Sequence, residues 1–261
     1  MSETKTINPL SISSVFIEMK YNDEVLGVGT AFYYKKDDKL YLLSNWHNYS
    51  GRNPETKRPI HSQAALPNQI KVYSYKVLGE SIELNEQTYP LQDENGDSLW
   101  YEHGELGSKV DVAALPINID FEVLDINEAI NEIDPYDNRA LEIGENLFVL
   151  GYPFGISGGS YFPIWKSASI ASEPEIDCDS LPLFYIDTAT REGMSGSPVV
   201  KYKDRPVSLI SNDRKVSSFA EFVGVYSGRI IPKDLIEVQL GKVWKASCID
   251  KVLSGSLYVD A

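Results

Sequence analysis

Three histidines limit the choice of a general base. The chain contains only His47, His61 and His103. His47 follows the apolar run 40–46 at the end of an expected strand, whereas His61 lies in a polar loop and His103 in an acidic one. An imidazole titrates near neutral pH, so it can take a proton from a nucleophile. A single histidine is more often structural than catalytic, so its interpretation depends on further groups.

A serine flanked by glycines is the candidate nucleophile. Residues 191–200 read Arg-Glu-Gly-Met-Ser-Gly-Ser-Pro-Val-Val, a turn of small residues that runs into an apolar strand. Gly193 and Gly196 allow backbone N–H groups to approach a ligand and leave Ser195 at a tight bend, as an oxyanion-binding nucleophile site requires. An ordinary glycine-rich hairpin turn has the same composition, so the turn alone leaves both interpretations open.

A carboxylate inside an apolar strand supplies the third group. Asp111 lies in the segment Val110–Ile117, which is otherwise apolar. Burial of a carboxylate is costly unless it is hydrogen-bonded or paired, so a partner is implied, although an aspartate that caps a loop is the alternative. Ser195, His47 and Asp111 together can act as nucleophile, base and the acceptor that fixes the tautomer of the base.

Chain order separates the candidate folds. The nucleophile elbow of an α/β-hydrolase requires a histidine after the serine, and none follows Ser195. The order His47, Asp111, Ser195 is instead that of the double-barrel serine peptidases.

Five short motifs support the same fold. They are Gly-Val-Gly-Thr-Ala-Phe at 27–32, Leu-Ser-Asn-Trp-His at 43–47, Asp-Val-Ala-Ala-Leu at 111–115, Gly-Tyr-Pro-Phe-Gly at 151–155 and Gly-Met-Ser-Gly-Ser-Pro at 193–198. With these motifs in this order, the sequence resembles the trypsin-like (chymotrypsin-fold) serine peptidases, especially the bacterial branch that includes the HtrA and glutamyl endopeptidase families. The resemblance covers most of the chain. It implies an all-β fold of two six-stranded antiparallel β-barrels.

The resemblance also implies a role for each site residue. His47 would be the general base, Asp111 its orienting acid and Ser195 the nucleophile of a serine endopeptidase that forms an acyl-enzyme intermediate. The N–H groups of Gly193 and Ser195 would form the oxyanion hole, and residues 222–228 would bind the substrate backbone as an added strand. The residues expected to line the substrate site are Thr188, Ala189, Thr190, Tyr226, Ser227 and Gly228.

Several positions depart from the family pattern. Secreted members that are activated by cleavage carry an aspartate directly before the nucleophile, whereas this chain has Met194, so its oxyanion loop must be ordered in another way. Ala189 stands where members that cleave after Lys or Arg carry an aspartate. The separation of 64 positions from His47 to Asp111 suggests an insertion in the first barrel.

Two alternatives to a constitutively active peptidase are open at this stage. One is a catalytically silent binding module that keeps the protease fold. The other is an enzyme that is latent until a regulatory protein partner orders the loop around Met194. We expect a peptide or protein substrate and no cofactor or metal.

The elements expected to position the site are short strands. A stretch with helical spacing at Ile126, Ile130 and Ile133 separates two sets of them. The expected units are an N-terminal barrel at 1–124, an acidic linker at 125–145, a C-terminal barrel at 146–232, and an amphipathic helix and tail at 233–261. The expected strands are 14–20, 25–35, 40–46, 70–76, 110–117, 146–152, 164–171, 183–188, 197–202, 207–211 and 221–230.

Composition narrows the possible partners. The 261 residues include 38 acidic and 24 basic ones, a net charge of −14, which makes nucleic acid and anionic membranes poor partners. Residues 80–137 contain 16 of the acidic residues and one basic residue, Lys109. Cys178 and Cys248 show no spacing typical of a zinc site or a disulfide framework, which favours buried free thiols in a reducing compartment. With no apolar signal core or membrane span, we expect a cytoplasmic protein.

Overall fold

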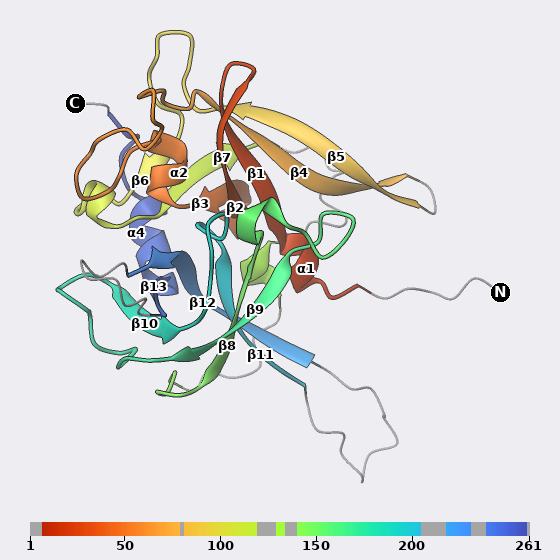
Figure 1. The fold of residues 1–261 in the computed structure, drawn as a ribbon, viewed down its shortest axis with the longest axis vertical. Coiled ribbons are helices and arrows are strands. Elements are labelled where there is room, and N and C mark those ends of the chain that lie inside the picture. The colour runs from red at the N-terminus through yellow and green to blue at the C-terminus, as the bar shows by residue number, and fades with distance from the viewer. Residues whose placement is uncertain are drawn as a thin grey trace.

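Two β-sheet units make up most of the molecule. The computed structural model describes residues 7–78, 81–118, 129–133, 140–204, 218–230 and 239–259. In Figure 1 the N-terminal sheet occupies the upper half of the molecule and the C-terminal barrel the lower half. This arrangement confirms the all-β fold of two units. No helix in the described part of the chain is both long and apolar enough to cross a membrane.

The N-terminal unit is a seven-stranded sheet in the order β5-β4-β1-β2-β3-β7-β6. Its neighbouring strands are antiparallel. In the described residues it forms one sheet of seven strands, where we expected a closed barrel of six, because β4 and β5 form a long hairpin at one side. The strands are β1 (Ser14–Tyr21), β2 (Glu24–Lys36), β3 (Lys39–Ser44), β4 (Gln69–Leu78), β5 (Ser81–Pro90), β6 (Tyr101–Glu102) and β7 (Ala113–Ile117).

The C-terminal unit is a closed barrel in the order β10-β13-β12-β11-β8-β9. The six strands confirm the barrel expected for this half of the chain. They are β8 (Asn146–Gly151), β9 (Ile164–Ile170), β10 (Leu183–Asp187), β11 (Pro198–Asp204), β12 (Ser218–Arg229) and β13 (Leu240–Lys245).

The amphipathic helix expected over 233–253 is confirmed at its end, Ile249–Leu253, and is wrong at residues 240–245. Leu240–Lys245 form β13, which pairs with β10 and β12 and so closes the barrel. The apolar residues that suggested a helix also suit this strand, because both of its faces are buried. Val243 lies in the barrel core and Trp244 in the core between the two units. Only α4 (Ile249–Leu253) is α-helical, preceded by the 3-10 turn η4 (Ala246–Cys248). Residues 231–238 lie outside the described part.

The remaining helices are short. They are α1 (Leu10–Ser13), α2 (Trp46–Ser50) and the 3-10 turns η1 (Gly107–Lys109), η2 (Ile130–Glu132) and η3 (Pro153–Gly155).

Residues 129–133 of the expected acidic linker pack on the N-terminal sheet, whereas residues 141–145 contact the barrel. Asn131 in η2 exchanges two hydrogen bonds with the backbone of Lys35 in β2, at 3.0 and 2.7 Å. Ile130 is buried beside it. Residues 119–128 and 134–139, with much of the expected linker, lie outside the described residues, as does the expected strand 207–211.

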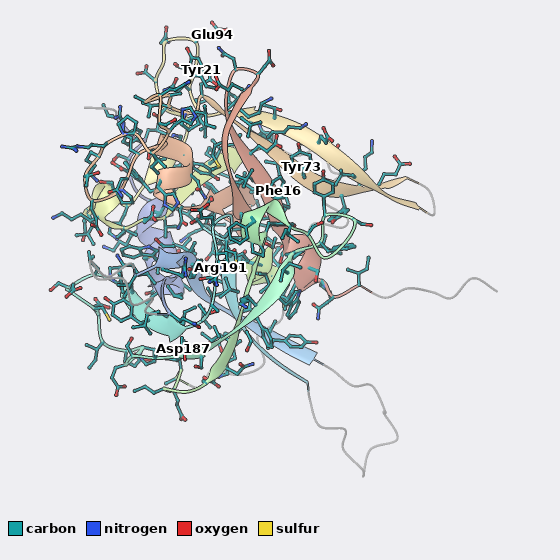
Figure 2. The ribbon with its side chains drawn as sticks, viewed as in Figure 1. Phe16, Tyr21, Tyr73, Glu94, Asp187 and Arg191 are labelled. Carbon is teal, nitrogen blue, oxygen red and sulfur yellow. The ribbon has the colours of Figure 1, made fainter. Side chains whose placement is uncertain are left out.

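One continuous apolar core joins the two units. It combines Phe32 and Leu43 of the N-terminal sheet with Val200, Val225 and Trp244 of the barrel. A smaller aromatic group lies at the base of the β4–β5 hairpin, where Phe16 and Tyr73 point toward one another with their ring centroids 5.4 Å apart (Figure 2). Because apolar contacts hold the two units together, residues from both can be fixed around one site.

Candidate active site

The pairing of two strands brings His47 beside Asp111. Strand β3 pairs with β7 so that Ser44 lies opposite Ala113. The chain then turns into α2, which carries His47, while Asp111 directly precedes β7. The ring nitrogen Nδ1 of His47 lies 2.7 Å from Oδ2 of Asp111, and the backbone N–H of His47 donates to Oδ1 at 2.9 Å.

Three donors compensate the burial of Asp111, which is 4% exposed. Besides the two bonds from His47, the hydroxyl of Ser227 in β12 donates to Oδ2 at 2.6 Å. Such contacts offset the desolvation of a buried carboxylate. Because a carboxylate accepts hydrogen bonds, Nδ1 of His47 carries the proton and Nε2 is the basic nitrogen of the neutral ring.

Ser195, the candidate nucleophile, lies at a turn where its own carbonyl oxygen accepts two hydrogen bonds. Thr30 donates its N–H to the Ser195 carbonyl oxygen at 2.9 Å, and the Asn48 side-chain amide donates to the same oxygen at 3.2 Å. Ser195 is partly exposed, and it lines a cavity of about 570 Å³ together with His47. Among the described residues no hydrogen bond joins the His47 ring to the Ser195 hydroxyl. Catalytic contacts are often longer before substrate binds.

Two glycines make this turn possible. Gly193 and Gly196 have φ of +89° and +86°, in the region that side chains with a Cβ disfavour. A Cβ on Gly193 would collide with the carbonyl oxygen of Tyr152, and a Cβ on Gly196 with that of Thr30. The glycines are therefore required both by conformation and by space.

The backbone around Gly193 is oriented for anion binding. The N–H of Phe154, in η3, donates to the carbonyl oxygen of Glu192 at 2.6 Å. In a trans peptide the following N–H points the opposite way, so the Gly193 N–H is turned away from Phe154. Within the described residues neither this N–H nor that of Ser195 has an acceptor. Two such donors beside a nucleophile can stabilise an oxyanion.

The Met194 side chain anchors the same loop. It is fully buried in the barrel core, in one cluster with Val199, Val223 and Tyr226. The side chain of Thr30 adds a 2.8 Å hydrogen bond to the carbonyl oxygen of Gly193. Apolar burial and backbone bonds thus order the loop where other members use a charged aspartate.

Comparison with known sequences decides the family. Residues 29–209 match the profile of the trypsin-like peptidase domain, which is more than half of the chain. The chain belongs to this family. No curated protein sequence is detectably similar to it.

Solved structures similar to this chain share little sequence identity with it. The serine endoprotease from Yersinia pestis has a TM-score of 0.50 and 15% identity, over 96% of this chain and 66% of that one. The inactive form of the Rv3671c protease of M. tuberculosis H37Rv has a TM-score of 0.43 and 20% identity, over 94% of this chain and 89% of that one. This trypsin-like peptidase thus spans less than two thirds of the Yersinia pestis chain.

Several residues predicted to line the substrate site are enclosed by the barrel of this peptidase. Thr188, Thr190 and Tyr226 are at most 3% exposed, and the hydroxyls of Thr190 and Tyr226 are hydrogen-bonded to one another. The ring of Tyr226 lies against Gly241, where an added Cβ would be 2.7 Å from it. None of the three lines either cavity at the site. Ala189 beside them is partly buried.

The other two predicted substrate residues line a second cavity. Ser227 and Gly228 contribute to a space of about 860 Å³ that also reaches His47 and Asp111. Its basic lining residues were not predicted because they come from four separate segments. They are Lys57, Lys109, Arg229 and Lys242. In Figure 2, Arg191 at the start of the nucleophile turn lies near the middle of the molecule, above Asp187 of the barrel.

The two other histidines have different surroundings. His103 is buried, and its Nδ1 accepts from the N–H groups of Glu105 and Leu106 at 3.3 and 3.1 Å. Burial lowers the pKa of His103, so its ring is neutral and holds a loop. His61 lines the first cavity, and its buried Nδ1 has no partner among the described residues.

Metal ligands and thiols give no further site. In the part of the chain that the structure describes, no group of three or more His, Cys, Asp or Glu side chains could hold a metal ion. Cys178 and Cys248 are free thiols, the first partly and the second fully buried.

Proposed function

We propose that this trypsin-like peptidase is a serine endopeptidase that acts through Ser195, His47 and Asp111. The observation that carries the proposal is the buried Asp111 carboxylate, which holds the His47 ring at 2.7 Å while Ser195 lies on the same cavity. A hydroxyl needs such an oriented base to become a nucleophile at neutral pH.

Proton transfer and bond formation follow from this geometry. Nε2 of His47 takes the hydroxyl proton as Oγ of Ser195 attacks the peptide carbonyl carbon. The carbonyl oxygen becomes negative and accepts hydrogen bonds from the N–H groups of Gly193 and Ser195. The tetrahedral intermediate then expels the amine, which takes the proton from His47. Water, activated by the same base, releases the acyl group.

The edge of β12 would bind the substrate backbone. Gly228 and Arg229 pair with Lys242 and Gly241 of β13 on one side. On the other side, β12 pairs with β11 up to Val225, and the backbone of Tyr226 exchanges hydrogen bonds with Gly196 and Ser197. The backbone beyond Tyr226 can therefore accept an extended peptide as an added strand.

In the proposed enzyme, the oxyanion loop needs no partner protein to become ordered. In the single chain, Phe154 holds the Glu192 carbonyl and the core holds Met194. A latent enzyme with a regulatory partner would then have to be controlled at another point, such as access to the cavities.

Covalent labelling tests the proposal. We expect a fluorophosphonate probe to label the wild type, and Ser195→Ala and His47→Ala to abolish labelling and peptide hydrolysis to a similar extent, because the groups act as a unit. Ser62→Ala, at an exposed serine, is the matched control and should label like wild type. Labelling that persists in Ser195→Ala would overturn the assignment. No turnover of a peptide library by wild type would instead favour a silent binding module.

A further inference from the structure

The second cavity is basic in a strongly acidic chain. Among the described residues, Lys57, Lys109, Arg229 and Lys242 line it, together with the acidic Glu55 and Asp111. Four positive and two negative described groups sum to +2, compared with −14 for the whole chain. Arg229 has a partner of its own and Lys242 faces Glu55, so the cations that remain for a ligand are Lys57 and Lys109.

The position of this cavity relates it to one half of a substrate. Its lining includes His47 and residues 227–230. Ser227 and Gly228 belong to the edge of β12 that we propose to bind the substrate backbone on the acyl side of the scissile bond. The first cavity instead lies against Leu26, Gly27 and Val28 of β2. The second cavity is therefore on the side of the substrate residues N-terminal to the scissile bond.

Lys57 and Lys109 bring two positive charges together at this cavity. The Nζ of Lys57 lies 4.8 Å from the centroid of the Trp46 ring and contacts the hydroxyl of Ser108. Burial lowers the pKa of the Lys57 amine, the carboxylates of Glu102 and Asp111 oppose this effect, and repulsion from Lys109 adds to it. Lys109 is exposed and is the one basic residue in the acidic stretch 80–137. An anion between the two would relieve this repulsion.

Lys242 faces the same space with a weak partner. Its Nζ lies 3.6 Å from a carboxylate oxygen of Glu55, whose side chain is 81% exposed, so this ion pair is easily exchanged. A ligand carboxylate can replace Glu55 as the partner of Lys242.

We infer that the second cavity binds acidic side chains of a peptide, on the N-terminal side of the bond that is cleaved. This inference rests on the proposed peptidase function. Carboxylates fit the lining because Lys57 and Lys109 are charged hydrogen-bond donors. A polynucleotide is the other polyanion, but its many phosphates would also meet the acidic surface of a chain with a net charge of −14.

Binding to an inactive variant tests the inference without turnover. We expect Ser195→Ala to bind a peptide that contains three glutamates about tenfold more tightly than the same peptide with glutamines, at low salt. The double change Lys57→Gln with Lys109→Gln should remove this preference. The matched control, Lys39→Gln with Lys166→Gln, makes the same change in net charge outside the cavity and should keep it. High salt should weaken the preference.

The outcomes separate this inference from the proposed function. Equal binding of the two peptides, or equal loss in the control variant, would overturn the binding of acidic side chains in this cavity while fluorophosphonate labelling still supports the peptidase. If the wild type is not labelled but the glutamate peptide binds, the cavity stands as a binding site and the peptidase does not. A single-stranded oligonucleotide that displaces the glutamate peptide at equal concentration would assign the cavity to phosphates and overturn the inference.

Discussion

The hydroxyl of Ser227 donates a 2.6 Å hydrogen bond to Oδ2 of Asp111. Ser227 belongs to the C-terminal barrel and Asp111 precedes β7 of the N-terminal sheet, so this bond connects the two units. The irregular register between Tyr226 and Gly228 places Ser227 toward the site. The orientation of the acid therefore depends on how the two units pack.

Removal of this hydroxyl should slow the enzyme. Ser227→Ala takes away one of the donors to a buried carboxylate, a bond to a charged group worth roughly 1.5–3 kcal/mol. Because His47 still donates twice to Asp111, we expect kcat/KM for a peptide to fall by about tenfold, near the lower end of that range. The thermal midpoint should show whether the fold is intact, and Ser62→Ala serves as the control. Unchanged kcat/KM would show that the bond is not needed.

Met194 should stabilise the fold and the oxyanion loop together. Met194→Ala leaves a cavity in the barrel core, at a cost of roughly 2–5 kcal/mol, whereas Met194→Leu conserves volume and should cost less than about 1.5 kcal/mol. We expect the rate of fluorophosphonate labelling to fall in the alanine variant and to be largely kept in the leucine variant. Urea unfolding gives the first quantity and a labelling time course the second. Equal rates in both variants would argue against a positioning role.

Local patterns predicted most of the strands. Residues 146–152 and 164–171 were expected from β-branched and aromatic runs, and the structure has strands at Asn146–Gly151 and Ile164–Ile170. Strand β5, Ser81–Pro90, was missed because Glu83 and Glu86 interrupt the apolar pattern, as an exposed edge strand allows.

Where the local patterns failed, contacts between residues distant in sequence determine the structure. Leu240–Lys245 carry residues that fit a helix or a strand, and the barrel selects the strand because β10 and β12 lie on either side. Likewise the sequence could place Tyr226 near the site but could not show that its ring is buried against Gly241, on the neighbouring strand. The basic cavity has the same origin, since Lys57 and Lys242 are 185 residues apart and meet only in the fold.

The two thiols should differ in reactivity. Burial raises the pKa of Cys248 to about 12, so its thiol stays protonated and protected at pH 8. Cys178 is partly exposed. We expect a thiol reagent to titrate one group in the native protein and two in denaturant, and Cys178→Ser to remove the native reaction. A second thiol that reacts quickly in the folded wild type would contradict the burial of Cys248.

Glu102 should make stability fall as pH rises. Its carboxylate is half-buried and accepts a 2.8 Å hydrogen bond from the indole of Trp46, the residue before His47. Burial raises the pKa of Glu102 above its ordinary value of 4.5, although Trp46 and Lys57 oppose the effect. The folded state thus binds the proton more tightly than the unfolded chain, and this contribution to stability is lost as pH rises from 4.5 through the raised value.

Substitution of this carboxyl isolates its contribution. Glu102→Gln keeps the shape and an acceptor for Trp46 but cannot ionise, so it should gain stability relative to wild type between about pH 4 and 7, by less than about 1 kcal/mol because the group is half-exposed. Urea unfolding of both proteins at the two pH values measures the difference, in which the other titrating groups cancel. A difference that stays constant with pH would show that Glu102 has the same proton affinity in the folded and unfolded chains.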